Sequence, residues 1–112
     1  MSAPRLNRAV WLQQPTATPD GAGGYNTGWT EMGMLWCAIK HGSGRVSTGD
    51  GGAVSKMAHR FIVRASPVGT SSRPMPGQRF VDETGHFTIT AVAEHDPMGR
   101  FLICFTEKEI AV

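Results

Sequence analysis

The sequence lacks the features that mark several common functional classes. Its 112 residues contain only two cysteines, and no apolar run approaches the roughly 20 residues of a membrane-spanning helix. Lysine and arginine outnumber aspartate and glutamate by only 11 to 9, so no basic stripe is available for a nucleic acid. The first ten residues, MSAPRLNRAV, lack the apolar core of a secretory signal. We therefore expect one small globular domain, residues 1–112, away from the membrane, with residues 1–4 as a flexible arm.

Patterns for catalysis and metal binding are also missing. No pair of cysteines or histidines has the close spacing of a metal site, and the four histidines are scattered, at His41, His59, His86 and His95. Serines near two of these histidines sit on or beside the most flexible stretch, whereas a nucleophile needs a base and an orienting group on rigid elements. We expect no enzyme, no cofactor and no metal.

That flexible stretch, residues 42–53, reads GSGRVSTGDGGA and contains five glycines among twelve residues. Its start comes close to the G-x-G-x-x-G pattern but has serine at the last position, and a strand rather than a helix is expected to follow. A phosphate cradle is therefore excluded. A connection of this length without structure of its own is usually functional or disordered. We predict a long, projecting loop, with a disordered surface excursion as the alternative.

The rest of the chain predicts short strands separated by turns. No segment holds a helical period over three turns, although a short helical turn near Val54 to Met57 is compatible with the pattern. The expected strands are Leu6–Gln14, a segment near Tyr25 and Trp29, Met34–Lys40, Met57–Arg64, Gln78–Asp82, His86–Glu94 and Arg100–Glu107. The sequence thus predicts an all-β fold, a small antiparallel β-barrel or sandwich with one long glycine-rich inter-strand loop.

Turn residues divide these strands. Pro15 is expected to end the first strand, and the turn-forming sequence Thr16–Gly24 to follow as a loop. The proline-rich Ser66–Gly77 is a second loop, and Glu83-Thr84-Gly85 a tight hairpin connection. Asp96-Pro97-Met98-Gly99 fits a type I turn, with Asp, Pro and Gly at their preferred positions.

The faces of the strands predict a core and a contact surface. Met34–Lys40 and Arg100–Glu107 are apolar on both faces, so one face of each needs a partner. We assign to a candidate inter-subunit surface Leu35, Cys37, Ile39, Leu102 and Cys104. We expect both cysteines to be small buried thiols in a reducing cytosol, with a disulfide as the less favoured alternative. In the last two strands the predicted shared faces are Phe87, Ile89, Ala91 and Ala93, and Phe101, Ile103 and Phe105.

The order of these segments resembles a known family. An LNRAVWLQQP strand leads into TPDGAGGYNTGWTEM; Leu35-Trp36-Cys37-Ala38-Ile39 precedes the long connection and Ala58–Arg64 follows it. Pro76-Gly77-Gln78-Arg79-Phe80 and the strand from His86 to Val92 complete the pattern. Over residues 5–107 this order is similar to the head-tail joining proteins of tailed bacteriophages and of gene transfer agents.

The resemblance implies a structural subunit of a particle's neck, assembled in the bacterial cytoplasm. Family members form homo-oligomeric rings, six copies being favoured here over twelve. The portal or adaptor ring lies above and the tail terminator or tail tube protein below, and packaged double-stranded DNA passes through the lumen without sequence-specific contacts. The ring seals the DNA channel and offers a surface to the tail.

In some members a long loop projects into the lumen as a plug, and the matching residues here are Gly42, Ser43, Gly44, Arg45, Val46, Ser47, Thr48, Gly49, Asp50, Gly51 and Gly52. Folded back as a hairpin, the stretch would reach about 20 Å at roughly 3.3 Å per residue. Its charges, Arg45 and Asp50, cancel, so DNA would be neither gripped nor strongly repelled. The alternative function is a monomeric small β-barrel that binds single-stranded nucleic acid or a peptide, with the loop as its clamp.

Overall fold

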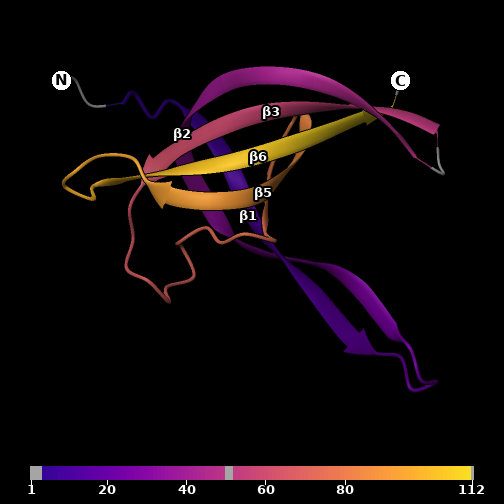
Figure 1. The fold of residues 1–112 in the computed structure, drawn as a ribbon. Helices are drawn as coiled ribbons and strands as arrows, with labels where there is room; N and C mark the ends of the chain where they lie inside the picture. The colour runs from indigo at the N-terminus through magenta and orange to yellow at the C-terminus, as the bar shows by residue number, and fades with distance from the viewer. Residues whose placement is uncertain (1–3, 50–51, 112) are drawn as a thin grey trace.

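The computed structural model describes the backbone of residues 4–49 and 52–111 and the side chains of residues 4–42 and 56–108. Of the predicted N-terminal arm, residues 1–3 lie outside the described residues. The described chain is built from strands: β1 Arg8–Pro19, β2 Tyr25–Gly49, β3 Gly52–Arg64, β4 Arg79–Asp82, β5 Gly85–Glu94 and β6 Phe101–Ala111. Figure 1 shows their arrangement. Within this part of the chain there is no helix that could cross a membrane.

The six strands form one closed antiparallel barrel in the order β1-β2-β3-β6-β5-β4, which confirms the all-β prediction. Three phenylalanines fill the middle of its core. The Phe61 ring stacks on Phe80 at a centroid distance of 4.8 Å and meets Phe87 edge-on at 5.0 Å. The other buried members of this core come from β1, β2, β3, β5 and β6, and are Val10, Leu12, Cys37, Val63, Ile89, Leu102 and Cys104.

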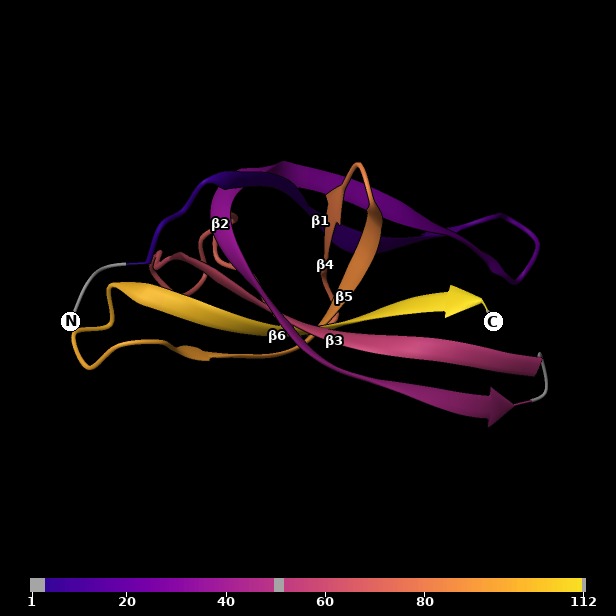
Figure 2. The same cartoon turned by 90° about the horizontal axis from the view of Figure 1, so that it is seen from above.

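Two β-hairpins extend beyond the barrel and give the molecule a longest dimension of 53 Å. The first, formed by β1 and β2, runs from the Gln13–Glu31 pair to the Pro19–Tyr25 pair. The second, formed by β2 and β3, runs from the Gly44–Met57 pair to the Gly49–Gly52 pair, and the end of β6 lies beside it. Both leave the barrel on the same side, which is the right-hand side in Figures 1 and 2.

The first hairpin corrects the prediction that Pro15 ends a strand and that Thr16–Gly24 is a loop. The strand continues to Pro19, and the turn is confined to Asp20–Gly24. There the Asp20 carboxylate accepts hydrogen bonds from the backbone N–H groups of Ala22 (2.8 Å) and Gly24 (3.0 Å). Beyond Gln13, β1 pairs with β2 alone, and proline is tolerated in a strand with an open edge.

The second hairpin corrects the prediction that residues 42–53 form a loop without structure of its own. Strand pairing continues to Gly49 and resumes at Gly52, so most of the stretch is antiparallel β-structure. Asp50 and Gly51 lie outside the described residues. In sequence, however, they form an Asp-Gly pair, which two-residue hairpin connections favour. The Asp-Gly pair inside the glycine-rich run is therefore a sequence feature that favours a hairpin.

In β3, the buried residues His59, Phe61 and Val63 point inward. The face predicted for the strand His86–Glu94 is partly wrong. A β-bulge between Ile89 and Ala91 shifts the alternation, so Ala91 and Ala93 are exposed and Val92 packs against the core instead. In β6 the residues that face the core are the even-numbered Leu102, Cys104 and Thr106.

The predicted turns and the second loop are confirmed. Residues 66–77 contain no strand. The Gly99 N–H donates to the Asp96 carbonyl at 3.0 Å, as in the predicted type I turn, and the Asp96 carboxylate accepts from the Arg100 N–H at 2.8 Å. Gly85 adopts a φ of 142°, which suits the glycine of the tight hairpin connection.

Candidate functional site

The β2–β3 hairpin begins at a β-bulge. Between the His41–His59 and Gly44–Met57 pairs, β2 has two residues, Gly42 and Ser43, opposite the single residue Ala58 of β3. A Cβ atom on Gly42 would lie 3.0 Å from the Ala58 carbonyl oxygen and 3.3 Å from the Ala58 Cβ. The two strands approach closely here because Gly42 has no side chain. A bulge bends the strand that carries it, so Gly42 sets the direction in which the hairpin leaves the barrel.

A cluster of histidine and phenylalanine rings lies next to this bulge, at the His41–His59 pair. The His59 imidazole is buried, with its Nδ1 3.3 Å from the Met57 carbonyl oxygen. It meets the rings of His41 and Phe87 edge-on, at centroid distances of 5.0 and 5.1 Å. Lys108 places its Nζ 5.0 Å from the centre of the Phe87 ring. Burial, more than the nearby positive groups, lowers the pKa of His59. A neutral, packed imidazole therefore anchors the base of the hairpin.

The residues predicted to gate a channel lie along this hairpin. Gly42 is at its base, and the backbone of residues 43–49 and Gly52 forms its two strands. Asp50 and Gly51 are outside the described residues. The six backbone pairs between Gly44 and Gly49 give a reach of about 20 Å at roughly 3.3 Å per residue. The structure thus brings the predicted gating residues together on one projecting element, and their role in gating stays a prediction.

The predicted inter-subunit surface is wrong. Cys37, Leu102 and Cys104 are at most 1% exposed in the barrel core, and Leu35 and Ile39 pack against that core. Periodicity identified one face of each strand but could not tell which face pointed inward. The outward apolar side chains are those of the alternate positions, Met34 and Trp36 in β2 and Ile103 and Phe105 in β6.

Both cysteines are buried free thiols, as the favoured prediction had it, rather than a disulfide. Burial raises the pKa of the Cys37 thiol to about 12 and that of Cys104 to about 12. Because the thiolate is the reactive form, neither cysteine is a nucleophile at neutral pH. Among the residues that the structure describes, no group of three histidine, cysteine or acidic side chains could hold a metal ion.

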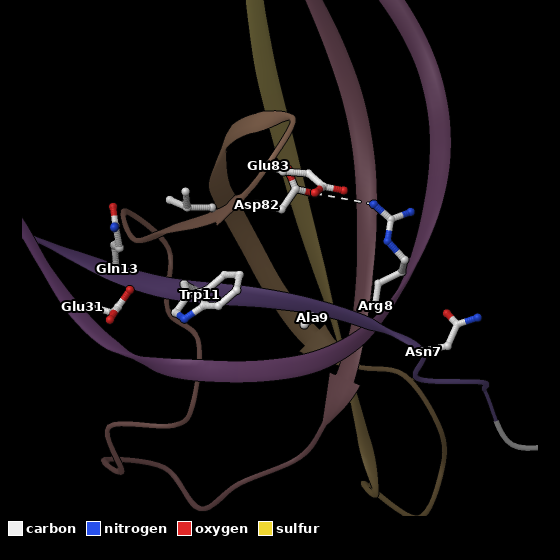
Figure 3. A pocket seen from close by; sticks show the side chains of 9 residues that line it. Asn7, Arg8, Ala9, Trp11, Gln13, Glu31, Asp82 and Glu83 are labelled. Atoms are coloured by element: carbon white, nitrogen blue, oxygen red, sulfur yellow. Dashed lines mark ion pairs between the residues drawn. The ribbon is translucent and has the colours of Figure 1, made fainter.

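A pocket of about 560 Å³ lies on the outside of the barrel where β1 passes the β4–β5 turn (Figure 3). The exposed indole of Trp11 lies between Glu31 on one side and Glu83 on the other. Asp82 also lines the pocket, but its carboxylate is already engaged. It lies 3.7 Å from the Arg8 guanidinium and accepts hydrogen bonds from the Thr84 N–H (2.7 Å) and hydroxyl (2.6 Å). This pocket was not predicted from the sequence, because it is formed by β1 and the β4–β5 turn, which are distant in the chain.

Arg79 braces the base of the β1–β2 hairpin against β4. Its guanidinium carbon lies 3.9 Å from the centre of the Trp29 ring, and its Nε donates to the Gln13 side chain at 2.8 Å. Stacking of this kind holds the ring and the cation in a fixed relative position. The first hairpin, which like the second begins at a β-bulge, between the Leu12–Gly33 and Gln13–Glu31 pairs, is thereby fixed at its base.

With this geometry established, comparison with known proteins identifies the chain. The sequence profile of the phage head completion proteins matches residues 1–109. The chain belongs to this family. It is also similar to a chain in a solved structure of the virion of a native gene transfer agent particle, with 38% identity and a TM-score of 0.88 over 98% of this chain and 100% of that one. No curated protein sequence matches the chain at a significant level.

Membership of the head completion family makes this head completion protein a non-enzymatic, structural component of a phage or gene transfer agent particle. It confirms the resemblance recognised in the order of sequence segments. It also favours a particle component, which assembles with other particle proteins, over a monomeric binding module.

Proposed function

We propose that this head completion protein forms a ring at the head-tail junction, closes the DNA channel after packaging and offers a docking surface to the tail. The neighbours of the ring would be the portal or adaptor ring above and the tail terminator or tail tube protein below. Packaged double-stranded DNA would occupy the lumen without sequence-specific contacts. Family membership and the similarity to a chain of a gene transfer agent particle support this proposal.

The observation that carries the gating part of the proposal is the β2–β3 hairpin. It projects from the barrel as an element of about 20 Å, and the end of β6 supports it on one side. Its sequence from residue 42 to residue 53 is rich in glycine and carries one positive and one negative charge. Copies of such a hairpin, converging from a ring, would obstruct a channel of the width of a DNA duplex without gripping the phosphates.

The bulge at Gly42 gives this gate a hinge. A bulge interrupts the β2–β3 ladder and leaves the extra residue unpaired. The β3–β6 pairing runs unbroken past this point, so the hairpin and the end of β6 would change their angle together while the barrel keeps its core contacts. Hinges absorb a change of direction in a few residues. The gate would then open as a unit, with its strands still paired, rather than by unfolding.

Particles that lack the protein provide the first test. We expect packaged heads to lose their DNA and to remain without tails, as seen by electron microscopy and by nuclease sensitivity of the DNA. Heads that keep their DNA and join tails at the normal frequency would contradict the proposed function.

A pair of deletions tests the hairpin itself. Removing residues 46–47 together with 54–55 deletes two facing pairs, Val46–Ser55 and Ser47–Val54, and shortens the hairpin by about 7 Å while every remaining side chain keeps its face. Removing residues 16–17 together with 27–28 shortens the β1–β2 hairpin by the same amount and serves as the control. We expect DNA leakage from full heads with the first deletion only. Equal retention of DNA by both variants would contradict a gating role for the β2–β3 hairpin.

A further inference from the structure

Two walls, centred on opposite strand pairs of the barrel, have complementary character. In the order β1-β2-β3-β6-β5-β4, each strand lies opposite the one three places away, so β1 faces away from β6 and β4 from β3. The wall formed by β1 and β4 carries the Trp11 pocket. The wall on the far side is formed by β3 and β6, with the neighbouring edge of β2. A ring built head to tail needs two different surfaces that fit each other.

The first wall, the Trp11 wall, presents unpaired negative charge around an aromatic ring. Glu31 and Glu83 are exposed on either side of Trp11, whose side chain is 41% exposed (Figure 3). Neither carboxylate forms an ion pair with a residue in the described part of the chain. The Asp82 carboxylate beside them is satisfied by Arg8 and Thr84. A partner of opposite charge with some apolar surface suits this wall.

The second wall, the Arg60 wall, presents unpaired positive charge around apolar side chains. Lys40 of β2 lies directly opposite Arg60 of β3, and Arg60 lies opposite Phe105 of β6. Like charges that face each other across two strands destabilise a sheet unless an anion lies between them. No ion pair of Lys40 or Arg60 with another described residue is present.

Other side chains on the Arg60 wall are also apolar or positively charged. Phe105 is 39% exposed, and Ile103 is partly exposed beside it. Arg64 lies over the Phe101 ring at 5.7 Å. Glu107, at the hairpin end of the wall, has an interaction of its own. Lys40 also borders a hollow of about 520 Å³ that is lined by Arg5, Asn7 and Arg8 as well. Asn7 and Arg8 also line the Trp11 pocket, so the two walls adjoin along β2. The wall therefore suits a partner that brings carboxylates and an apolar ring.

We propose that the Trp11 wall of one copy binds the Arg60 wall of the neighbouring copy, so that Glu31 meets Lys40, Glu83 meets Arg60, and Trp11 meets the exposed face of Phe105. This inference rests on the ring of the proposed function and names the contact that would build it. The two walls are different surfaces of each barrel, so the contact is heterologous: it repeats from copy to copy rather than stopping at a dimer, as the ring of the proposed function requires.

Double-stranded DNA is the competing occupant of the Arg60 wall, because its phosphates would also neutralise Lys40 and Arg60. DNA would leave the Trp11 wall without a partner, since Glu31 and Glu83 repel phosphates. A second copy of the chain accounts for both walls at once. The experiments separate these occupants.

Charge reversal and rescue in assembled particles test the contact. Glu83→Lys and Arg60→Glu should each lower the yield of tailed, DNA-filled particles by about tenfold, because like charges would face each other in the interface. Combined in one chain, they should restore the yield, since the pair is again of opposite sign. Glu94→Lys, at an exposed carboxylate in β5 outside both walls, makes the same change in net charge as Glu83→Lys and should have no effect.

The outcomes separate the contact from the proposed function. Normal yields from both single variants, while particles without the protein still fail, would overturn the contact and leave the ring intact. Loss of DNA with Arg60→Glu alone, in particles that keep a full complement of the protein, would assign the Arg60 wall to DNA and overturn the proposal. Failure of the double variant to recover would also overturn the contact, provided that the purified double variant melts at the wild-type temperature. If it melts at a lower temperature, crosslinking of the wild-type chain decides instead.

Carbodiimide crosslinking of wild-type particles supplies that second measurement. It joins a lysine amine to a carboxylate in direct contact, and we expect a Lys40–Glu31 link and a ladder of covalent multimers beyond the dimer. Lys40 and Glu31 lie nine residues apart on β2, about 30 Å, so their link must join two copies. Lys40→Arg keeps the charge and removes the amine, and should abolish the link. Absence of the Lys40–Glu31 link from assembled wild-type particles would overturn the contact.

Discussion

Gly42 offers the sharpest test of the hairpin's geometry. In Gly42→Ala, the new Cβ would lie 3.0 Å from the carbonyl oxygen of Ala58 and 3.3 Å from its Cβ. Both are held in place by β3, which is paired on both sides at this point, with β2 and β6. Either the strands separate by a few tenths of an ångström or the bulge rearranges. Overpacking of this kind destabilises a protein by about 1–3 kcal/mol.

Thermal unfolding followed by circular dichroism measures the effect. For a chain of this size, that loss corresponds to a fall in the melting temperature of roughly 5–15 °C. Gly28→Ala is the matched control, because its Cβ would meet only the Thr16 hydroxyl oxygen, at an ordinary 3.5 Å. Neither glycine adopts a positive φ, so the two substitutions differ in close contacts and not in backbone strain.

We expect Gly28→Ala to leave stability unchanged or to raise it by about 0.4–1 kcal/mol, because alanine has less freedom in the unfolded chain. A Gly42→Ala variant that melts at the wild-type temperature would refute the close packing of the bulge. So would a control that loses as much stability as Gly42→Ala.

Further predictions concern the core and the pH dependence of stability. Cys37 and Cys104 should not react with a thiol reagent at pH 8 in the folded protein, since burial raises the pKa of each to about 12; both should react in denaturant, and labelling without denaturant would contradict the buried core. Phe61→Ala should lower the free energy of unfolding by about 3–5 kcal/mol in chemical denaturation, because two phenylalanine rings pack on Phe61. Phe105→Ala, at a half-exposed ring, should cost far less stability and instead reduce incorporation into particles; the reverse order would be inconsistent with the burial described. Burial lowers the pKa of His59 below its ordinary value of about 6.5, so the unfolded chain binds that proton first and stability should fall as the pH drops below about 6.5. His59→Gln should flatten this part of the profile, and an unchanged profile would count against a buried neutral imidazole.

The sequence predicted those parts of the fold in which burial of one strand face produces an alternating pattern of side chains, or in which a turn requires particular residues. His59, Phe61 and Val63 lie on the core face of β3 and alternate with Arg60, Ile62 and Arg64. The two arginines are exposed, and Ile62 between them is buried on the outer face. The turn at Asp96–Gly99 was recognisable because proline and glycine occupy positions that suit few other residues.

The two hairpins were missed because little of their surface is buried. Thr16–Pro19 and Thr27–Trp29 lie in a ribbon of two strands with solvent on most sides, where glycine and proline are tolerated and no alternation is needed. In Gly42–Ala53, glycine suggested disorder, although backbone pairing depends little on side chains. Strands that pair far from any core carry only their turn residues as a signal.

The choice of inter-subunit surface failed for a different reason. Met34–Lys40 is apolar on both faces, and a period of two is the same for either face. Only the barrel's closure shows that Cys37 points inward and Trp36, 54% exposed, points outward. The Trp11 pocket could not be predicted at all, since it needs the pairing of β1 with β4, which lies about seventy residues further along the chain.

Electron cryo-microscopy of the head-tail junction in DNA-filled particles tests the central claim most directly. We predict a ring of these barrels at the junction, with the β2–β3 hairpins directed into the channel and the Trp11 wall of each copy against the Arg60 wall of the next. Barrels whose β2–β3 hairpins point away from the channel, or a junction that does not contain this chain, would contradict it.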